Sequence, residues 1–178
     1  GNDGNKLVPV SVDGTAGAVS FSLGMQHSCF VHEEGQVYCW GRCDDGRCGD
    51  GVDGNHFQLE PNPVLTISDA LTVSAGESST CALQSNGEVF CWGRCDDGRC
   101  GDGIDGNHQV TTPTQVLNLE TAIEVIVGYD HACALQSDGA AVCWGRCDDG
   151  RCGDGIDENH SQLSPADVVV SDFSTVCE

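Results

Sequence analysis

The sequence predicts an all-β protein built as a repeat array, and three observations support this prediction. The thirteen residues Cys39–Gly51 return at Cys91–Gly103 and again at Cys143–Gly155, which sets a period of 52 residues. A strict period of this length is typical of solenoids, propellers and related arrays. The composition, with 24 Gly but only 3 Trp, 2 Tyr and 5 Phe, favours short strands and tight turns. Each repeat also contains a hairpin pattern with two apolar faces, as expected of a β-propeller-type blade that packs between neighbours.

We expect one repeat domain that covers the whole chain. Its boundaries follow the period: residues 1–178 divide into repeat one at 1–56, repeat two at 57–108, repeat three at 109–160, and a partial fourth repeat at 161–178 with a linker and one extra C-terminal strand. The chain opens on Gly1 rather than on Met and an apolar run, as expected of a secreted protein whose signal peptide has been removed.

The charge balance is strongly acidic, with 28 Asp and Glu against 7 Lys and Arg and a formal net charge of −21. Nucleic acid is therefore not expected as a partner, because neutralising phosphates requires clustered basic residues. The acidity favours cations; solubility, or life at high salt, would also explain it. Thirteen Cys indicate an oxidising compartment, so we expect a secreted, extracellular protein. No apolar run of about 18 residues occurs, and no membrane span is expected.

Each repeat is expected to have a linker and then a strand, such as Ala18–Leu23, Leu71–Ala75 or Ile123–Val127, followed by Gly and a polar bend. A hairpin comes next, and its turn, Glu33–Gly35, suits a three-residue loop that ends on a left-handed Gly. That loop places Cys29 opposite Cys39, within reach of a disulfide, whereas a two-residue loop would place Cys29 opposite Trp40. The three-residue loop predicts the disulfides Cys29–Cys39, Cys81–Cys91 and Cys133–Cys143.

An acidic loop, Cys43–His56, follows the hairpin and has too many Gly and Asp residues for a helix or a strand. The Pro-containing segments Phe57–Val64 and Gln109–Val116 are interpreted as linkers to the next unit. All basic residues except Lys6 are Arg residues of the repeated motif, and each lies near at least two Asp residues. We expect these Arg side chains to hold the acidic loop together through charge-assisted hydrogen bonds.

The order of these residues resembles the repeat of the regulator of chromosome condensation family, in the Cys-containing form found in secreted bacterial proteins. In the first repeat the pattern is carried by Gly24–Cys29, Gly35–Gly41 and Gly46–Gly51, and equivalent residues occur in both later repeats. The resemblance covers nearly the whole chain and implies three four-stranded propeller blades. The family usually closes a ring of seven blades and usually has Asn and Leu where this chain has Cys43 and Cys48. The nucleotide exchange activity of the nuclear member cannot be carried over residue by residue.

The other two cysteines of each motif enclose Asp-Asp-Gly-Arg and are expected to form a small disulfide loop in place of the contacts normally made by Asn and Leu. The pairs are Cys43–Cys48, Cys95–Cys100 and Cys147–Cys152. A zinc or other metal site made of four thiolates is the alternative, although the C-x3-C-x4-C spacing differs from that of the usual zinc knuckles.

The Asp-rich part of the loop offers oxygen ligands on a Gly-rich backbone, which is what Ca²⁺ requires. The candidate ligands are Asp45, Asp50, Asp53, Asn55 and their equivalents Asp97, Asp102, Asp105, Asn107, Asp149, Asp154, Asp157 and Asn159. The spacing matches no EF-hand loop, and Asp-Gly is also ordinary turn chemistry. The neighbouring histidines are either turn residues or ligands of a transition metal, and they are His56, His108 and His160.

Three blades cannot close a propeller, so an open array exposes apolar faces and strand edges at both ends. We expect the chain to associate with itself head to tail, as a ring or a filament, through an added C-terminal strand. The contact residues are Phe173, Val176 and Cys177. Cys177 is left over from three sets of four, which makes it either an intermolecular disulfide partner or a free buried thiol.

The sequence therefore favours a secreted, disulfide-stabilised structural protein that self-assembles head to tail and binds Ca²⁺ in its acidic loops. Two other classes stay open: an extracellular propeller module that binds a carbohydrate or a protein, and a metal or redox protein that uses the Cys clusters. The sequence contains no nucleophile elbow, phosphate loop or haem motif, and no enzyme activity is expected.

Overall fold

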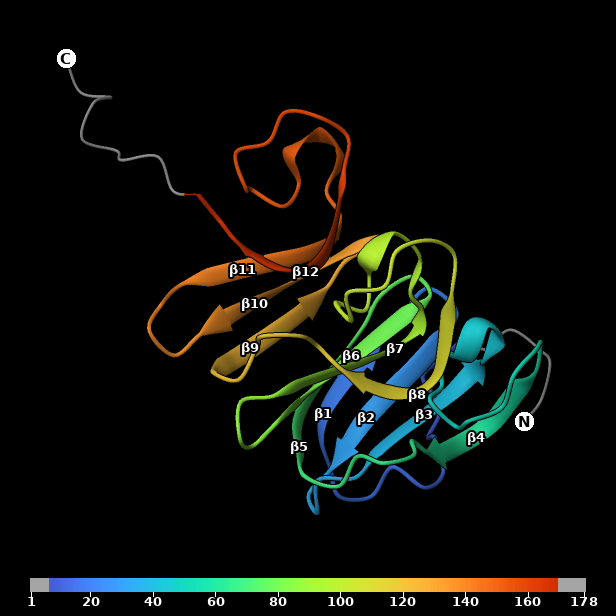
Figure 1. The fold of residues 1–178 in the computed structure, drawn as a ribbon. Helices are drawn as coiled ribbons and strands as arrows, with labels where there is room; N and C mark the ends of the chain where they lie inside the picture. The colour runs from blue at the N-terminus through green and yellow to red at the C-terminus, as the bar shows by residue number, and fades with distance from the viewer. Residues whose placement is uncertain (1–6, 170–178) are drawn as a thin grey trace.

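The computed structural model describes residues 7–169 and contains three antiparallel four-stranded sheets, which we call blades 1, 2 and 3 (Figure 1). The strands of each blade are paired in chain order. Their bounds are, for blade 1, β1 Ala18–Leu23, β2 His27–His32, β3 Val37–Arg42 and β4 Phe57–Pro63; for blade 2, β5 Ala70–Ala75, β6 Ser79–Gln84, β7 Val89–Arg94 and β8 Gln109–Gln115; for blade 3, β9 Ala122–Val127, β10 His131–Gln136, β11 Ala141–Arg146 and β12 Ser161–Asp167. The all-β class and the three four-stranded blades are thus confirmed.

The hairpin between the second and third strands has the register that a three-residue turn predicts. In blade 1, Cys29 lies opposite Cys39, and Ser28 rather than Cys29 faces Trp40. Gly35 takes a φ of 85° in the turn, a left-handed conformation that favours glycine. The other two blades repeat this register, so the alternative two-residue loop is not formed.

The Pro-containing segments are strands, and their interpretation as linkers is wrong. Phe57–Pro63 is β4, which pairs with β3 so that Phe57 faces Arg42 and Pro63 faces Tyr38. Pro is tolerated there because β4 is the outermost strand, whose second edge has no ladder to maintain. Each blade therefore takes its fourth strand from the beginning of the next sequence repeat.

The same holds at the end of the described chain, where Ser161–Asp167 is β12 of blade 3 and not the linker of a fourth repeat. The extra strand expected around Phe173–Cys177 lies outside the described residues.

The acidic loops contain one short helical turn each, which the sequence did not predict. The three 3₁₀ turns are η1 Asp44–Gly46, η2 Asp96–Gly98 and η3 Asp148–Gly150. The second Asp of each turn takes a left-handed conformation, which Asp adopts more readily than most residues; these are Asp45, Asp97 and Asp149, with φ values of 59°, 57° and 59°. The chain thereby reverses within the small loop between two cysteines.

The core lies between blades, with blade 2 stacked between blades 1 and 3 (Figure 1). One cluster joins Val31 and Val37 of blade 1 to Val73 and Trp92 of blade 2, and a second cluster joins blade 2 to blade 3 in the same way. Both faces of the blade 2 hairpin are apolar because this blade packs against a neighbour on each side. No helix in the described residues is long and apolar enough to cross a membrane.

Candidate functional site: the acidic loops and the open blade faces

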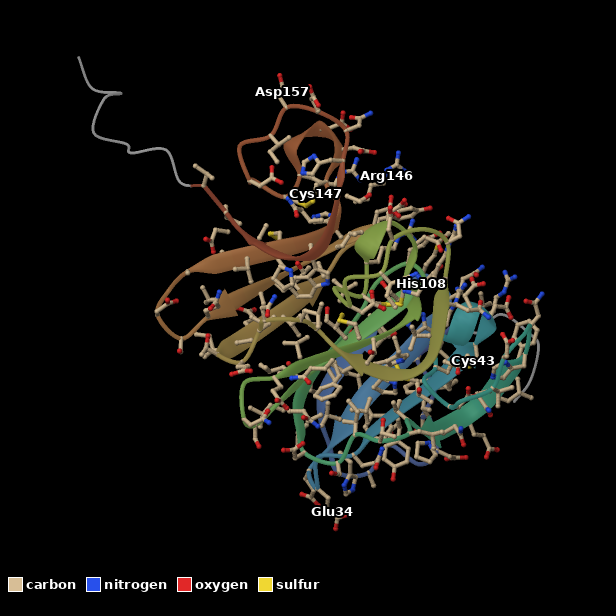
Figure 2. The ribbon with its side chains drawn as sticks, viewed as in Figure 1. Glu34, Cys43, His108, Arg146, Cys147 and Asp157 are labelled. Carbon is tan, nitrogen blue, oxygen red and sulfur yellow. A yellow bond between two sulfur atoms is a disulfide. The ribbon has the colours of Figure 1, made fainter. Side chains whose placement is uncertain are left out.

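The structure contains all six disulfides that the sequence predicts. Three join opposed strands at a Cα–Cα distance of 4.1 Å and three close the acidic loops at 5.0 to 5.1 Å. All twelve Cys of the described residues are thus in disulfides, and none of them is left as a thiolate for a four-thiolate metal site. Figure 2 shows Cys147 on the acidic loop of blade 3, next to Arg146.

Asp44 organises the first acidic loop, although it was not among the predicted ligands. Its buried carboxylate pairs with Arg42 through Oδ2 and accepts a hydrogen bond from the backbone N–H of His56 at 3.1 Å through Oδ1. Asp96 does the same for the second loop, accepting from the N–H of His108 at 2.9 Å. The predicted role of the Arg residues in holding the loop is confirmed by these pairs, and the Arg-x-Asp spacing was the signal for Asp44.

A His–Asp pair closes the far end of each acidic loop. The Nε2 atom of His56 lies 2.8 Å from Oδ2 of Asp50, and its Nδ1 lies 3.1 Å from the carbonyl oxygen of Gly54. The same pair forms between His108 and Asp102 and between His160 and Asp154. With acceptors on both sides of the ring, the geometry favours the doubly protonated imidazolium.

These contacts shift the pKa values of both members of the His–Asp pair. Burial opposes protonation of His56, but the hydrogen bonds to Asp50 and Gly54 outweigh it and raise its pKa. Burial likewise opposes ionisation of Asp154, but hydrogen bonds from His160, from the Ile156 N–H and from Gln162 lower its pKa to about 2. At mildly acidic pH each His–Asp pair is therefore an ion pair within its acidic loop.

The oxygen ligands predicted for calcium have separate protein partners. Asp45 pairs with Arg47 at 2.9 Å, and Asp50 is held by His56. Asp53 accepts from the N–H of Gly54 at 2.7 Å. In the third loop, Asp157 lies at the outer end and points away from Cys147 (Figure 2). The structure therefore does not bring these carboxylates together around one ion.

A different group of potential ligand atoms does converge in the described residues. The Sγ of Cys43, a carboxylate oxygen of Asp50 and a ring nitrogen of His56 lie within 4.8 Å of one another, as do their equivalents in the other two loops. The sulfur is bonded to Cys48, so it is not available as a thiolate ligand.

Trp residues anchor the contacts between blades. We call the face that a blade turns toward the preceding blade its leading face, and the opposite face its trailing face. Trp92 on the leading face of blade 2 is fully buried and donates its Nε1–H to the carbonyl oxygen of Arg47 at 3.1 Å. Trp144 of blade 3 donates in the same way to the carbonyl oxygen of Arg99 at 3.1 Å.

The socket for each Trp is shaped by a glycine. A Cβ added at Gly49 would lie 2.9 Å from Nε1 of Trp92, and one at Gly101 would lie 3.1 Å from Trp144. A side chain at either position would collide with the ring, so the glycine of the motif is required by the close approach of the next blade.

No blade covers the leading face of blade 1 in the part of the chain that the structure describes. Phe21 is 50% exposed, whereas the equivalent Val73 and Val125 are 5% exposed. Leu23 is 71% exposed, whereas the equivalent Ala75 and Val127 are 8% and 9% exposed. Positions that the preceding blade covers inside the array are therefore uncovered at this end.

Within residues 7–169, the trailing face of blade 3 is open as well. The side chain of Arg151 is 31% exposed, against 6% for Arg47 and 7% for Arg99. An apolar cavity of about 160 Å³ lies on this face and includes Leu135 and Ala141 in its lining. In the described residues, the Trp socket at Gly153 is lined by Val168 and contains no Trp. The predicted contact residues Phe173, Val176 and Cys177 lie outside the described part of the chain.

Stacked four-stranded blades with a Trp-Gly anchor and a 52-residue period define a protein of the β-propeller repeat class. The family model for the Regulator of chromosome condensation (RCC1) repeat matches residues 34–83 and 86–135. This chain belongs to the RCC1 repeat family.

Curated relatives and solved structures agree with this assignment. The chain is 30% identical to the regulator of chromosome condensation of Drosophila melanogaster over 83% of this chain and 27% of the relative. It is 30% identical to the protein pim1 of Schizosaccharomyces pombe over 77% of this chain and 29% of the relative. Both matches span less than a third of the relative.

The fold is similar to Prp20p of Saccharomyces cerevisiae, with a TM-score of 0.76 at 19% identity over 87% of this chain and 39% of that one. It is also similar to human WBSCR16, with a TM-score of 0.73 at 21% identity over 88% of this chain and 40% of that one. At these identities the structures support the fold alone.

Proposed function

We propose that this chain is a structural protein of an extracellular, oxidising environment that self-assembles head to tail through its propeller blades. The observation that carries this proposal is the contrast between equivalent positions. Leading-face residues that are covered in blades 2 and 3 are exposed in blade 1, and the trailing face of blade 3 is uncovered in turn. Apolar faces of this kind favour association.

The disulfides support the oxidising environment. Six disulfides in a chain of 178 residues indicate a compartment where thiols are oxidised, and secretion is the simplest route to one. The four cysteines of every repeat fix the hairpin and the acidic loop in the same geometry. Identical, rigid blades are what a regular assembly requires, because a heterologous contact repeats only if its two surfaces have fixed shapes.

Sedimentation velocity over a range of protein concentrations tests this proposal. We expect a shift from monomer to larger species, with rings or filaments visible by negative-stain microscopy. A single monomeric species at all concentrations, in low and in high salt, would contradict the proposal. Replacing Phe173 and Val176 by Asp in the full chain shows whether the predicted tail strand is needed for assembly.

A ligand-binding module is the second candidate, and one observation favours it. A polar cavity of about 340 Å³ lies between the acidic loops of blades 1 and 2 and is lined by Asp45, Arg94, Asp96, Asn107, His108 and Gln109. Carboxylate, guanidinium and amide groups in one cavity are suited to the hydroxyl groups of a carbohydrate. Binding of glycans to the monomer, abolished by Arg94→Ala, would support this candidate over the structural role.

Calcium is not part of the structural proposal, because Asp45, Asp50 and Asp53 have separate protein partners. A calorimetric titration with Ca²⁺ tests this, and heat of binding at submillimolar concentration would restore the expectation from the sequence.

A metal or redox role for the Cys clusters requires free thiols. Intact mass with twelve oxidised Cys and no retained metal would exclude that role.

A further inference from the structure

We infer that blade 1 of one copy docks directly on blade 3 of a second copy, with Trp40 entering the socket formed by the Arg151 carbonyl and Gly153. This inference rests on the proposed self-assembly and names the surfaces that carry it. The occupant of each open face is thus the opposite face of another copy of this chain.

The two internal interfaces supply the geometry of this contact. Each places a leading-face Trp over a motif glycine and within hydrogen-bond distance of an Arg carbonyl, as Trp92 does over Gly49 and at Arg47. Trp40 is the equivalent Trp of blade 1, and it is only partly buried. Arg151 and Gly153 are the equivalent socket of blade 3, which no Trp of the described residues fills.

A His–hydroxyl pair supports the match between the two ends. Across the interface of blades 1 and 2, Nε2 of His27 lies 2.8 Å from Oγ1 of Thr80, which donates to the Arg47 carbonyl at 3.1 Å. The interface of blades 2 and 3 has Ser79 and Ala132 at these positions and lacks this pair. The two outer faces carry the residue types that can form it between copies, since blade 3 has His131 and blade 1 has Ser28 at these positions.

The sizes of the two end faces are also matched. On the leading face of blade 1, Phe30 stands where blades 2 and 3 have Ala82 and Ala134. Phe30 is fully buried and stacks on Tyr38 with ring centroids 5.0 Å apart, so the aromatic layer that supports this face is bulkier than in the other two blades. On the trailing face of blade 3, Ala141 stands where blades 1 and 2 have Val37 and Val89. The leading face of blade 1, which has the larger side chains, is thus paired with the trailing face of blade 3, which has the smaller one, as complementary packing requires.

Two features make the new contact weaker than the internal ones. Ser22 and Ser74 accept a hydrogen bond from the next blade at 2.9 Å, but blade 3 has Ile126 at this position. In addition, residues 11–13 lie beside Trp40, where they line a cavity of about 220 Å³ with it. Val12 occupies the repeat position of Val168, which the receiving copy already supplies, so docking displaces this segment. The association is therefore reversible.

Two substitutions at exposed positions test the inference in the full chain. Leu23→Asp places a carboxylate on the leading face of blade 1, and Ala141→Asp places one on the trailing face of blade 3. Each should raise the dissociation constant by roughly 100-fold, the cost of burying an unpaired charge. The matched controls are Leu23→Ala, which copies Ala75, and Ala141→Val, which copies Val37 and Val89. Both controls should change the dissociation constant by less than about tenfold.

Mixing the two Asp variants gives the decisive result. Every contact needs both faces, so at concentrations where the 100-fold weakening leaves each variant monomeric on its own, the mixture still has one intact leading face and one intact trailing face. We expect a dimer and nothing larger in the mixture by sedimentation velocity. If the unaltered chain associates but both Asp variants associate equally well, self-assembly stands and the docking of blade faces is overturned. If the mixture stays monomeric although each control associates, the head-to-tail contact is overturned. If the unaltered chain never associates, both proposals fail.

Discussion

The three Trp residues give a direct comparison of covered and open blade faces. They occupy the same position in identical sequence motifs, yet Trp92 and Trp144 are fully buried and Trp40 is partly exposed. Truncating a fully buried Trp to Ala costs about 3 to 5 kcal/mol, because the transfer free energy of the ring is lost and a cavity remains. Trp40→Ala removes less buried surface, because Trp40 is only partly buried, and should cost less, about 2 to 3 kcal/mol in the monomer.

Guanidinium unfolding, followed by circular dichroism in dilute oxidising buffer, measures these costs as changes in midpoint. The Phe variants are a matched control because they keep most of the apolar area and lose the Nε1–H donor. Trp92→Phe and Trp144→Phe should cost about 1 kcal/mol more than Trp40→Phe through the lost hydrogen bond. Equal costs for Trp40→Ala and Trp92→Ala in the monomer would refute the reasoning, since they would mean that the preceding blade contributes nothing to Trp packing.

Three further predictions concern the disulfides, the His–Asp pairs and the charge. Replacing Cys43 and Cys48 by Ser should lower the unfolding free energy by about 2 kcal/mol and replacing Cys29 and Cys39 by about 3 kcal/mol, as expected from their separations of 5 and 10 residues; equal midpoints by denaturant titration would contradict this. The pKa of His108 is raised because its hydrogen bonds to Asp102 and Gly106 outweigh burial, so its stabilisation is full below about pH 6.5 and is lost as pH rises through the folded pKa. His108→Gln should therefore lower the melting temperature more at pH 5.5 than at pH 8.5, and the reverse order would show that the pair does not favour the imidazolium. With a net charge of −21, copies repel one another, so raising NaCl from about 50 to 500 mM should tighten self-association several-fold by sedimentation; weaker association in salt would point to ion pairs at the junction instead.

The blade architecture could be predicted from the sequence because its determinants are local. Gly35 in the turn sets the hairpin register, and that register places Cys29 opposite Cys39. The strand β4 was missed because Pro61 and Pro63 are typical of linkers, and only the pairing of β4 as an outer strand makes them compatible with a sheet.

The acidic loop shows what composition alone cannot decide. Several carboxylates on a Gly-rich loop are compatible with a cation site, but the backbone places Asp45 at Arg47 and Asp50 at His56. Asp44, which joins Arg42 to the backbone of His56, is indistinguishable from its neighbour Asp45 by residue type. The fold decides between these roles because Asp45 takes a left-handed φ of 59° in the 3₁₀ turn, and the carboxylates of Asp44 and Asp45 have different Arg partners.

The open ends depend on the arrangement of whole blades. Alternating apolar residues predict two packed faces for every blade, but only the structure shows that Leu23 is exposed where Ala75 and Val127 are covered. The proposed pairing of the two open faces follows from the repeat symmetry of the internal interfaces.

Cryo-electron microscopy of the purified, oxidised protein tests head-to-tail assembly most directly. We expect particles in which blades continue across the boundary between copies, with density for Trp40 of one copy over Gly153 of the next. Separate three-blade particles at high protein concentration, or copies joined by two leading faces, would contradict it.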